Sequence, residues 1–227
     1  MASDRDIWII VPAFNEAAAL AATLTPLCHH YTNVVVVDDG STDDTVRIAT
    51  RYPVFRLQHL LNRGQGAALR TGIEFAIHRG AEILVTFDAD GQHSVGDIDK
   101  LIQPILHNAV DVTLGSRFLG SAEGLPHGRR IVLRLGVLFT RFFSKIKVTD
   151  THNGMRAFSK AAAIRLKIRH DGMAHASEIL DEIHRLKLRF QEVPVGIRYS
   201  WDSLKKGQSS WNSIRIVTQL LLGRLFR

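Results

Sequence analysis

Three polar clusters follow apolar runs in the first half of this 227-residue sequence, and their side chains are of the types that bind cations and phosphates. They occupy residues 12–16 (PAFNE), 38–43 (DDGSTD) and 88–93 (DADGQH). In the third cluster Asp88 and Asp90 are separated by one small residue, so both carboxylates can reach a single Mg²⁺ or Mn²⁺ ion. Gln92 offers a further oxygen ligand, and His93 offers a nitrogen if the metal is manganese.

Each cluster also has a simpler interpretation. Asp, Ser and Gly after a strand are common turn and helix-capping residues, so Ser41 or Asp43 is equally well placed to cap the next helix. One cluster alone does not decide between capping and function. Three of them at strand ends in one parallel sheet favour a nucleotide site, because ligands bind beyond the carboxyl ends of such strands.

Two other motifs are incomplete. The segment 64–66 (GQG) begins a dinucleotide-binding fingerprint, but Leu69 stands where the third glycine belongs. DADG also occurs in phosphatases with an aspartyl nucleophile after their first strand. Here it follows the fourth expected strand, and Gln92 stands where those enzymes carry threonine. We therefore favour neither class.

Apolar runs alternate with helical patterns over the first half, which predicts a mostly parallel α/β sheet flanked by helices. The second half contains two basic amphipathic helices, at 129–145 and 211–226. The Gly- and Ser-rich stretch 115–128 is predicted to be a mobile loop. The remaining expected strands are 7–11, 33–38, 54–58, 83–87, 110–114 and 190–195, and the remaining helices are 16–27, 43–51, 64–79, 98–106 and 176–186.

Charge divides the chain into two unequal halves. Residues 1–125 hold 9 Lys and Arg against 15 Asp and Glu, whereas residues 126–227 hold 20 against 7. An acidic front and a basic back suggest a cation site and an anionic ligand or surface, respectively. The basic half shows no RNA-binding aromatic signature, zinc finger or helix-turn-helix pattern, so nucleic acid is not an expected partner. The single cysteine, Cys28, excludes a disulfide framework and fits a reducing compartment.

The sequence resembles the family-2 glycosyltransferases of GT-A fold, and within them the group of dolichyl- and polyprenyl-phosphate glycosyltransferases. The matching stretches follow one another in the family's order over about two thirds of the chain. They are VPAFNE (11–16), VDDGSTDDT (37–45), NRGQGAALRTG (62–72), DADGQH (88–93), GSRF (115–118) and DTHNGMRAFS (150–159). The resemblance implies a single GT-A domain over 1–227, with a donor half at 1–115 and an acceptor half at 116–227.

The resemblance also implies roles for individual residues. Asp88, Asp90 and Gln92 would hold Mg²⁺ or Mn²⁺ and, through it, the diphosphate of a UDP- or GDP-sugar. Arg117 would face the sugar phosphate or an acceptor phosphate. The implied nucleoside and donor contacts are Pro12, Ala13, Asn15, Glu16, Asp38 or Asp39, Arg63, Gly64 and Ala89.

The reaction implied by the resemblance is an inverting displacement at the anomeric carbon. We expect Asp90, Arg117 and Glu178 to be the catalytic residues, although a place on an exposed helical face explains Glu178 equally well. A hydroxyl acceptor needs a base, for which Glu178 is favoured over Asp181, both on a predicted helix. A lipid phosphate is already ionised and needs arginines instead, and Arg117, Arg130 and Arg134 are the candidates. Lys205 and Lys206 could close over the diphosphate, although a solvated basic turn explains them equally well.

The acceptor and the location follow less directly. A lipid phosphate is our first expectation, a glycan or small-molecule hydroxyl the second, and a non-catalytic nucleotide-sugar binding module the third. The N-terminus has no signal-peptide pattern, and no segment reaches the roughly 20 apolar residues of a membrane span. We therefore expect a cytoplasmic protein that can bind peripherally to the cytoplasmic face of a membrane. The two basic helices could lie in that interface or pack on the sheet.

Overall fold

A computed structural model describes residues 6–144 and 146–199. Within this part, seven strands form one sheet in the order β3-β2-β1-β4-β6-β5-β7. Their bounds are β1 Ile7–Ala13, β2 Val34–Asp38, β3 Phe55–Gln58, β4 Ile83–Thr86, β5 Val112–Glu123, β6 Arg156–Ser159 and β7 Phe190–Arg198. The helices are α1 Leu20–His30, α2 Thr45–Ala49, α3 Gln65–His78, α4 Asp97–Leu106, α5 His127–Ser144, α6 Lys160–Arg165 and α7 His175–Arg185.

The sheet is mostly parallel, as the alternation of strands and helices predicts. β1 pairs in parallel with β2 and β4, β2 with β3, and β5 with β7. β6 is the exception, because it runs antiparallel to both β4 and β5. The expected fold class, a mostly parallel sheet flanked by helices, is confirmed.

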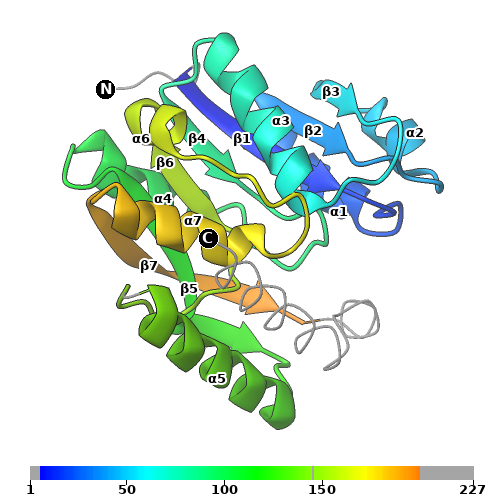
Figure 1. Cartoon of the computed structure of the whole chain (residues 1–227). Helices are drawn as coiled ribbons and strands as arrows, with labels where there is room; N and C mark the ends of the chain where they lie inside the picture. The colour runs from blue at the N-terminus through cyan, green and yellow to red at the C-terminus, as the bar shows by residue number, and fades with distance from the viewer. Residues whose placement is uncertain (1–5, 145, 200–227) are drawn as a thin grey trace.

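Two hydrophobic cores lie on opposite faces of the sheet because successive side chains of a buried strand point to opposite sides. In β1, Ile9 and Val11 join one core with α1 and α4, whereas Trp8 and Ile10 join the other with α3 and α7. Figure 1 shows α3 on one side of β1 and β2. The near-continuous apolar strands seen in the sequence are therefore explained by burial from both faces.

The stretch 115–128 is not the mobile loop that its composition predicts. β5 continues through it to Glu123 and pairs with β7, with a register irregularity between Ser116 and Ser121. Two of its glycines, Gly115 and Gly120, serve close packing: a side chain on Gly120 would overlap the Val195 carbonyl oxygen, and one on Gly115 would crowd the Met155 carbonyl oxygen. Two short elements were not among the expected ones: β6, which lies between β4 and β5 in the sheet, and the helix α6 that follows it.

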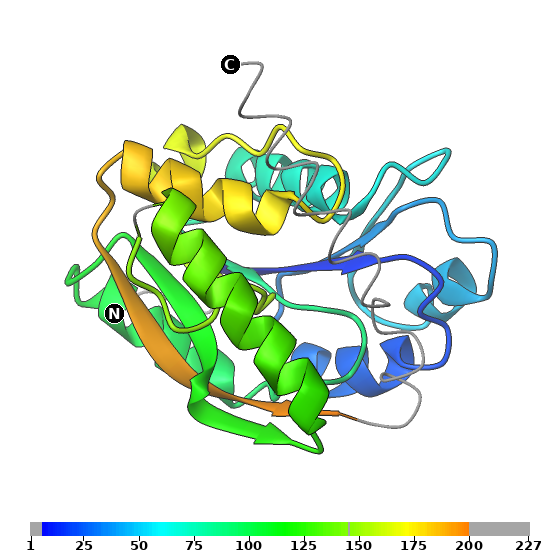
Figure 2. The same cartoon turned by 60° about the horizontal axis from the view of Figure 1, so that its bottom comes forward.

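Helix α5 runs beside β5 and β7 at the edge of the molecule (Figures 1 and 2). Only part of its apolar surface is covered by the rest of the protein. Val137 is buried, whereas four other apolar residues are exposed: Ile131, Val132, Leu135 and Leu138. No helix in the described residues is long and apolar enough to cross a membrane. The second expected amphipathic helix, 211–226, lies outside the described residues, as do Lys205 and Lys206.

Candidate functional site

A pocket of about 750 Å³ lies beyond the carboxyl ends of β1, β2 and β4, where the three polar clusters come together. Among the expected site residues, those lining it are Pro12, Ala13, Glu16, Asp39, Gly64, Asp88, Ala89, Asp90, Gln92 and Arg117. A second, more apolar groove between α3 and α6 is far less suited to chemistry because none of the acidic cluster residues lines it. The strand-end pocket is therefore the candidate active site.

Asp88 is held from two sides inside this pocket. Its Oδ1 accepts a hydrogen bond from Gln65 Nε2 at 2.9 Å, and its Oδ2 lies 3.3 Å from His93 Nε2. Burial acts to raise the pKa of Asp88, but the hydrogen bond from His93 and the nearby positive charges, including Arg156, hold this pKa below its usual value. Asp88 is therefore poised as an anion.

Asp90 has the opposite tendency. Burial, followed by the negative charge of Asp88, raises the pKa of Asp90 to about 6. Its Oδ1 accepts from the Gln92 backbone N–H at 3.0 Å and its Oδ2 from Gln92 Nε2 at 2.6 Å. The opposite pKa shifts show that Asp88 and Asp90 repel each other when both are ionised. The site therefore lacks enough positive charge to balance two carboxylates.

These residues fit a divalent cation. A cation between Asp88 and Asp90 would relieve the repulsion that raises the pKa of Asp90. No group of three or more His, Cys, Asp or Glu side chains in the described residues could hold a metal alone. The two carboxylates of Asp88 and Asp90 are nevertheless enough for Mg²⁺ or Mn²⁺. These ions are bound through one or two carboxylates and complete their coordination with water and substrate phosphate. The side-chain amide of Gln92 donates its Nε2–H to Asp90, so its side-chain oxygen lies near Asp90 and could join the metal ligands there.

Asp39 organises the side of the pocket next to residues 63–64. Its carboxylate accepts from the backbone N–H groups of Arg63 and Gly64 at 3.1 and 2.6 Å, and from His59 Nδ1 at 2.7 Å. Its neighbour Asp38 is also buried but does not line the pocket; one oxygen accepts from the Ser41 N–H at 3.2 Å, and the other has no partner in the described residues. Of the two, Asp39 is the one that reaches the pocket.

Two further residues expected at the donor site lie outside the pocket lining. Asn15, at a φ of 53°, accepts from the Thr42 N–H at 2.9 Å and donates its own backbone N–H to Ser41 Oγ at 2.9 Å. It therefore ties the loop after β1 to the loop after β2. Arg63 forms an ion pair with Asp171 at 3.2 Å, and only its backbone contacts Asp39. Both residues therefore hold loops next to the pocket without lining it.

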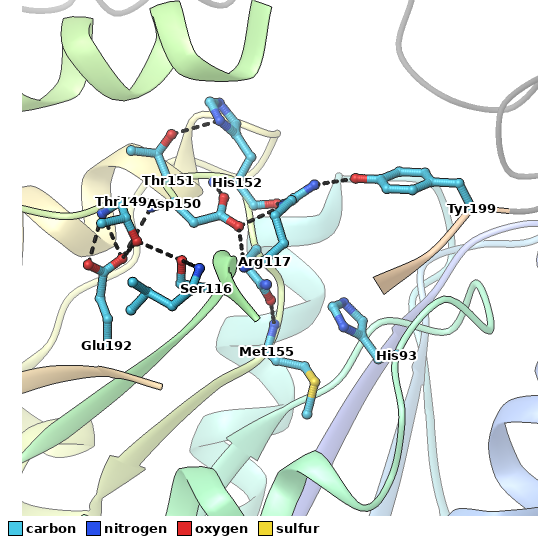
Figure 3. A network of polar contacts seen from close by, with 12 residues as sticks. His93, Ser116, Arg117, Thr149, Asp150, Thr151, His152, Met155, Glu192 and Tyr199 are labelled. Atoms are coloured by element: carbon cyan, nitrogen blue, oxygen red, sulfur yellow. Dashed lines mark hydrogen bonds and ion pairs between the residues drawn. The ribbon is translucent and has the colours of Figure 1, made fainter. Parts of the chain in front are cut away.

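Arg117 reaches the pocket from strand β5, not from a flexible loop, and it is buried in a polar network (Figure 3). Its Nε donates to Asp150 at 2.6 Å, its Nη1 to the Tyr199 hydroxyl at 2.5 Å and its Nη2 to the His152 carbonyl at 2.8 Å. Burial acts to lower the pKa of Arg117, but the charges of Asp150 and Tyr199 and their hydrogen bonds together raise this pKa above its usual value. The guanidinium is thus fixed, and its charge is balanced within the protein.

Residues His152, Tyr199, Met173 and Gln65 also line the pocket but had not been assigned a role from the sequence. His152 lies inside the DTHNG stretch, so that motif was the available signal for it. Tyr199 begins the part of the chain that resembles the family only loosely, and Met173 lies outside the matching stretches, so neither gave a signal. Four of the lining residues, Arg117, His152, Met173 and Tyr199, form one wall of the pocket, which we call the acceptor wall after the role proposed for it below. They come from β5, from the loops before β6 and α7, and from the residue that follows β7.

Glu178 is not placed to act as a base. It is buried, it does not line the pocket, and its Oε2 accepts from the backbone N–H groups of Arg169 and His170, both at 2.9 Å. The carboxylate satisfies a loop whose amides would otherwise lack partners, which is a structural role. Arg130 and Arg134 are exposed on α5 and also lie outside the pocket lining.

The comparisons with known proteins agree with this geometry. Residues 8–167 match Glycosyl transferase family 2. The chain is 33% identical to a UDP-N-acetylglucosamine–dolichyl-phosphate N-acetylglucosaminyltransferase of Methanococcus voltae, over 97% of this chain and 96% of that protein. It is 30% identical to an undecaprenyl-phosphate mannosyltransferase of Micrococcus luteus, over 82% and 81% of the two chains.

A solved structure shares the fold. Glucosyl-3-phosphoglycerate synthase from Mycobacterium tuberculosis, in complex with Mn²⁺ and UDP-glucose, superimposes with a TM-score of 0.72 at 21% identity, covering 96% of this chain and 77% of that one. At this identity the likeness supports the architecture alone. With the family match over most of the chain, it follows that this protein belongs to glycosyl transferase family 2, with a GT-A-like fold related to the dolichyl- and polyprenyl-phosphate glycosyltransferases.

Proposed function

We propose that this enzyme transfers a hexose, with inversion, from a nucleotide-diphosphate sugar to a polyprenyl-phosphate-type lipid, assisted by Mg²⁺ or Mn²⁺. The observation that carries the proposal is the division of charge in the pocket. The carboxylates that line it, Glu16, Asp39, Asp88 and Asp90, all come from the loops after β1, β2 and β4. The acceptor wall of Arg117, His152, Met173 and Tyr199 contributes none.

An acceptor wall without a carboxylate suits a nucleophile that is already ionised. A phosphate oxygen attacks the anomeric carbon from the face opposite the nucleoside diphosphate. The new C–O bond forms as the bond to the leaving phosphate breaks, and the electron pair of that bond remains on the nucleoside diphosphate. No proton has to be removed, so no general base is needed.

The donor side deals with the charge that grows on the leaving diphosphate. A divalent cation held by Asp88 and Asp90 would supply the electrostatic stabilisation of that charge. Asp39 keeps the 63–64 loop against the nucleoside end of the pocket through its two backbone hydrogen bonds. These residues therefore bind and orient the donor, and the acceptor wall positions the attacking oxygen.

The exposed apolar residues of α5 support a lipid acceptor. Ile131, Leu135 and Leu138 are each about 60% exposed, and Arg130 and Arg134 are exposed on the same helix. Apolar side chains beside cationic ones are typical of helices that lie in the headgroup region of an anionic membrane. We infer that α5 brings the pocket to the membrane surface, where a lipid phosphate is presented.

The test is a transfer assay on the full chain with UDP- and GDP-sugars, Mn²⁺ or Mg²⁺, and a short polyprenyl phosphate. The matched control acceptor is the corresponding polyprenol, which has the same chain and no phosphate. We expect glycosylated product only from the phosphate. Product from polyprenol or a soluble glycan would instead support the hydroxyl-acceptor alternative, with the His152 imidazole on the acceptor wall as a candidate base.

Membrane contact is tested separately by sedimentation with anionic vesicles. Burying a leucine side chain contributes about 1.5–3 kcal/mol, so Leu135→Glu should weaken vesicle binding by about tenfold or more. The matched control is Ile164→Glu on α6, because Ile164 is 58% exposed and Leu135 is 59% exposed. Equal loss of vesicle binding in both variants would contradict the role of α5.

A further inference from the structure

Gln65 connects the two ends of the donor pocket. It is the first residue of α3 and directly follows Gly64, whose backbone N–H donates to Asp39 at 2.6 Å. Its side-chain Nε2 donates to Asp88 Oδ1 at 2.9 Å. A continuous path therefore runs from the Asp39 carboxylate through two adjacent residues to the carboxylate that faces the expected cation.

Gly154 touches the same carboxylate from the opposite loop. A Cβ atom built on Gly154 would overlap the carboxylate of Asp88, so only glycine leaves room for that group in its observed position. The glycine's φ is not in the left-handed region, since it is absent from the residues with positive φ. Space, and not backbone conformation, is what this position requires.

The loop that carries Gly154 cannot easily retreat. The Gly154 carbonyl accepts from Thr86 Oγ1 at 2.6 Å, which joins the loop to β4. The buried Arg156 donates from Nε to the Asn153 carbonyl and from Nη2 to the Thr151 carbonyl, both at 3.2 Å. An added side chain at 154 would therefore displace Asp88 in preference to the loop.

Asp88 also has a competing partner. The Nη1 of Arg156 is buried and has no hydrogen-bond partner in the described residues, and the charges of Arg156 and Asp88 attract each other. A carboxylate free to rotate would lose its direction toward the pocket. The hydrogen bond from Gln65 counteracts that rotation on one oxygen, while His93 lies beside the other.

We propose that Gln65 and Gly154 are positioning residues for the Asp88 carboxylate: the amide fixes its direction, and the glycine keeps its place open. This inference rests on the proposed metal-assisted function. Groups that orient a metal ligand from outside its coordination shell typically affect metal affinity by about 10–100-fold. The same change is expected here without loss of the fold.

The experiment measures Mn²⁺ binding in the presence of UDP from the electron paramagnetic resonance signal of free Mn²⁺, on the full chain. Gln65→Met keeps the size of the side chain and removes its donor, and we expect Mn²⁺ affinity to fall by about 10–100-fold. The matched control is Gln103→Met, the same substitution at an exposed position of α4. Thermal unfolding without metal should be nearly the same for wild type and both variants.

Gly154→Ala should lose at least as much Mn²⁺ affinity, because the methyl group takes the space of the carboxylate. Its control is Gly128→Ala, where an added Cβ meets nothing within 4 Å. If Gly154→Ala does not fold, the Gln65→Met titration decides. Wild-type binding with unchanged affinity in Gln65→Met overturns this inference alone. Absence of Mn²⁺–UDP binding to the wild type overturns the proposed function and this inference with it.

Discussion

Asp90→Asn should make the metal-free protein more stable at neutral pH while removing its response to metal. The pKa of Asp90 lies near 6 in the folded chain, against 3.8 for an unperturbed carboxyl, because of burial and then the charge of Asp88. Between about pH 4 and 6, the folded state keeps a proton that the unfolded state has released. Stability therefore falls as pH rises through this window and levels off above it.

The size of the effect follows from the two pKa values. The raised pKa of Asp90 lowers the free energy of unfolding by about 3 kcal/mol at pH 7.5 and by about 1 kcal/mol at pH 4.5. Asparagine has a similar shape and no charge, so the variant escapes this cost. The free energy of unfolding of Asp90→Asn, measured against that of wild type, should therefore rise by about 2 kcal/mol between pH 4.5 and pH 7.5.

Urea denaturation at the two pH values measures this difference, with EDTA present. Asp44→Asn is the control, because Asp44 is exposed and the hydrogen bond and charge of Arg47 lower its pKa, so its pH dependence should have the opposite sign. In a second arm, Mn²⁺ and UDP at a hundredfold excess over the dissociation constant should stabilise wild type by about 2.7 kcal/mol. A stability difference for Asp90→Asn that does not change with pH, or full stabilisation of this variant by Mn²⁺ and UDP, would refute the reasoning.

Two further substitutions test the scaffold around the pocket. Asp150→Asn leaves the buried Arg117 guanidinium without its counter-charge and should cost about 3–5 kcal/mol of stability by urea denaturation; a loss below 1 kcal/mol would mean that the pair is not desolvated. Gly72→Ala on α3 places a methyl group 2.5 Å from Ile10 Cγ2. The overpacking should cost about 1–3 kcal/mol of stability, more than the gain of up to about 1 kcal/mol from the higher helix propensity of alanine. A more stable variant in urea denaturation would contradict this packing of α3 on β1.

The gathering of acidic residues in one pocket could be predicted from the sequence because its information is local. Asp88 and Asp90 follow a recognisable buried strand, and the topology of a parallel sheet brings strand ends to one edge without any long-range knowledge. The prediction of a mobile loop at 115–128 was wrong for the same reason, because it used local composition alone. Glycines are typical of flexible loops, but Gly115 and Gly120 lie against the backbones of Met155 and Val195, which are distant in sequence.

Glu178 shows a second limit of local patterns. A carboxylate on a helix after a histidine has the right chemistry for a base, and nothing nearby in sequence argues against that role. Its actual partners are backbone amides of the loop at 169–170, which only the folded chain brings within 2.9 Å. The type of a side chain thus indicates what it can do, whereas its hydrogen-bond partners determine whether it is free to do it.

Arg117 is a second residue whose partners limit what it can do. From sequence it is an anion-binding arginine, and in the structure its positive charge is already matched by Asp150. A guanidinium has five N–H donors, and three of its hydrogen bonds here hold Asp150, Tyr199 and the His152 carbonyl. The acceptor wall therefore offers an oriented dipole with little net charge. For the anionic acceptor proposed above, this wall would act by fitting the acceptor's geometry, and long-range attraction would come from other cationic groups such as the exposed Arg130 and Arg134 of α5.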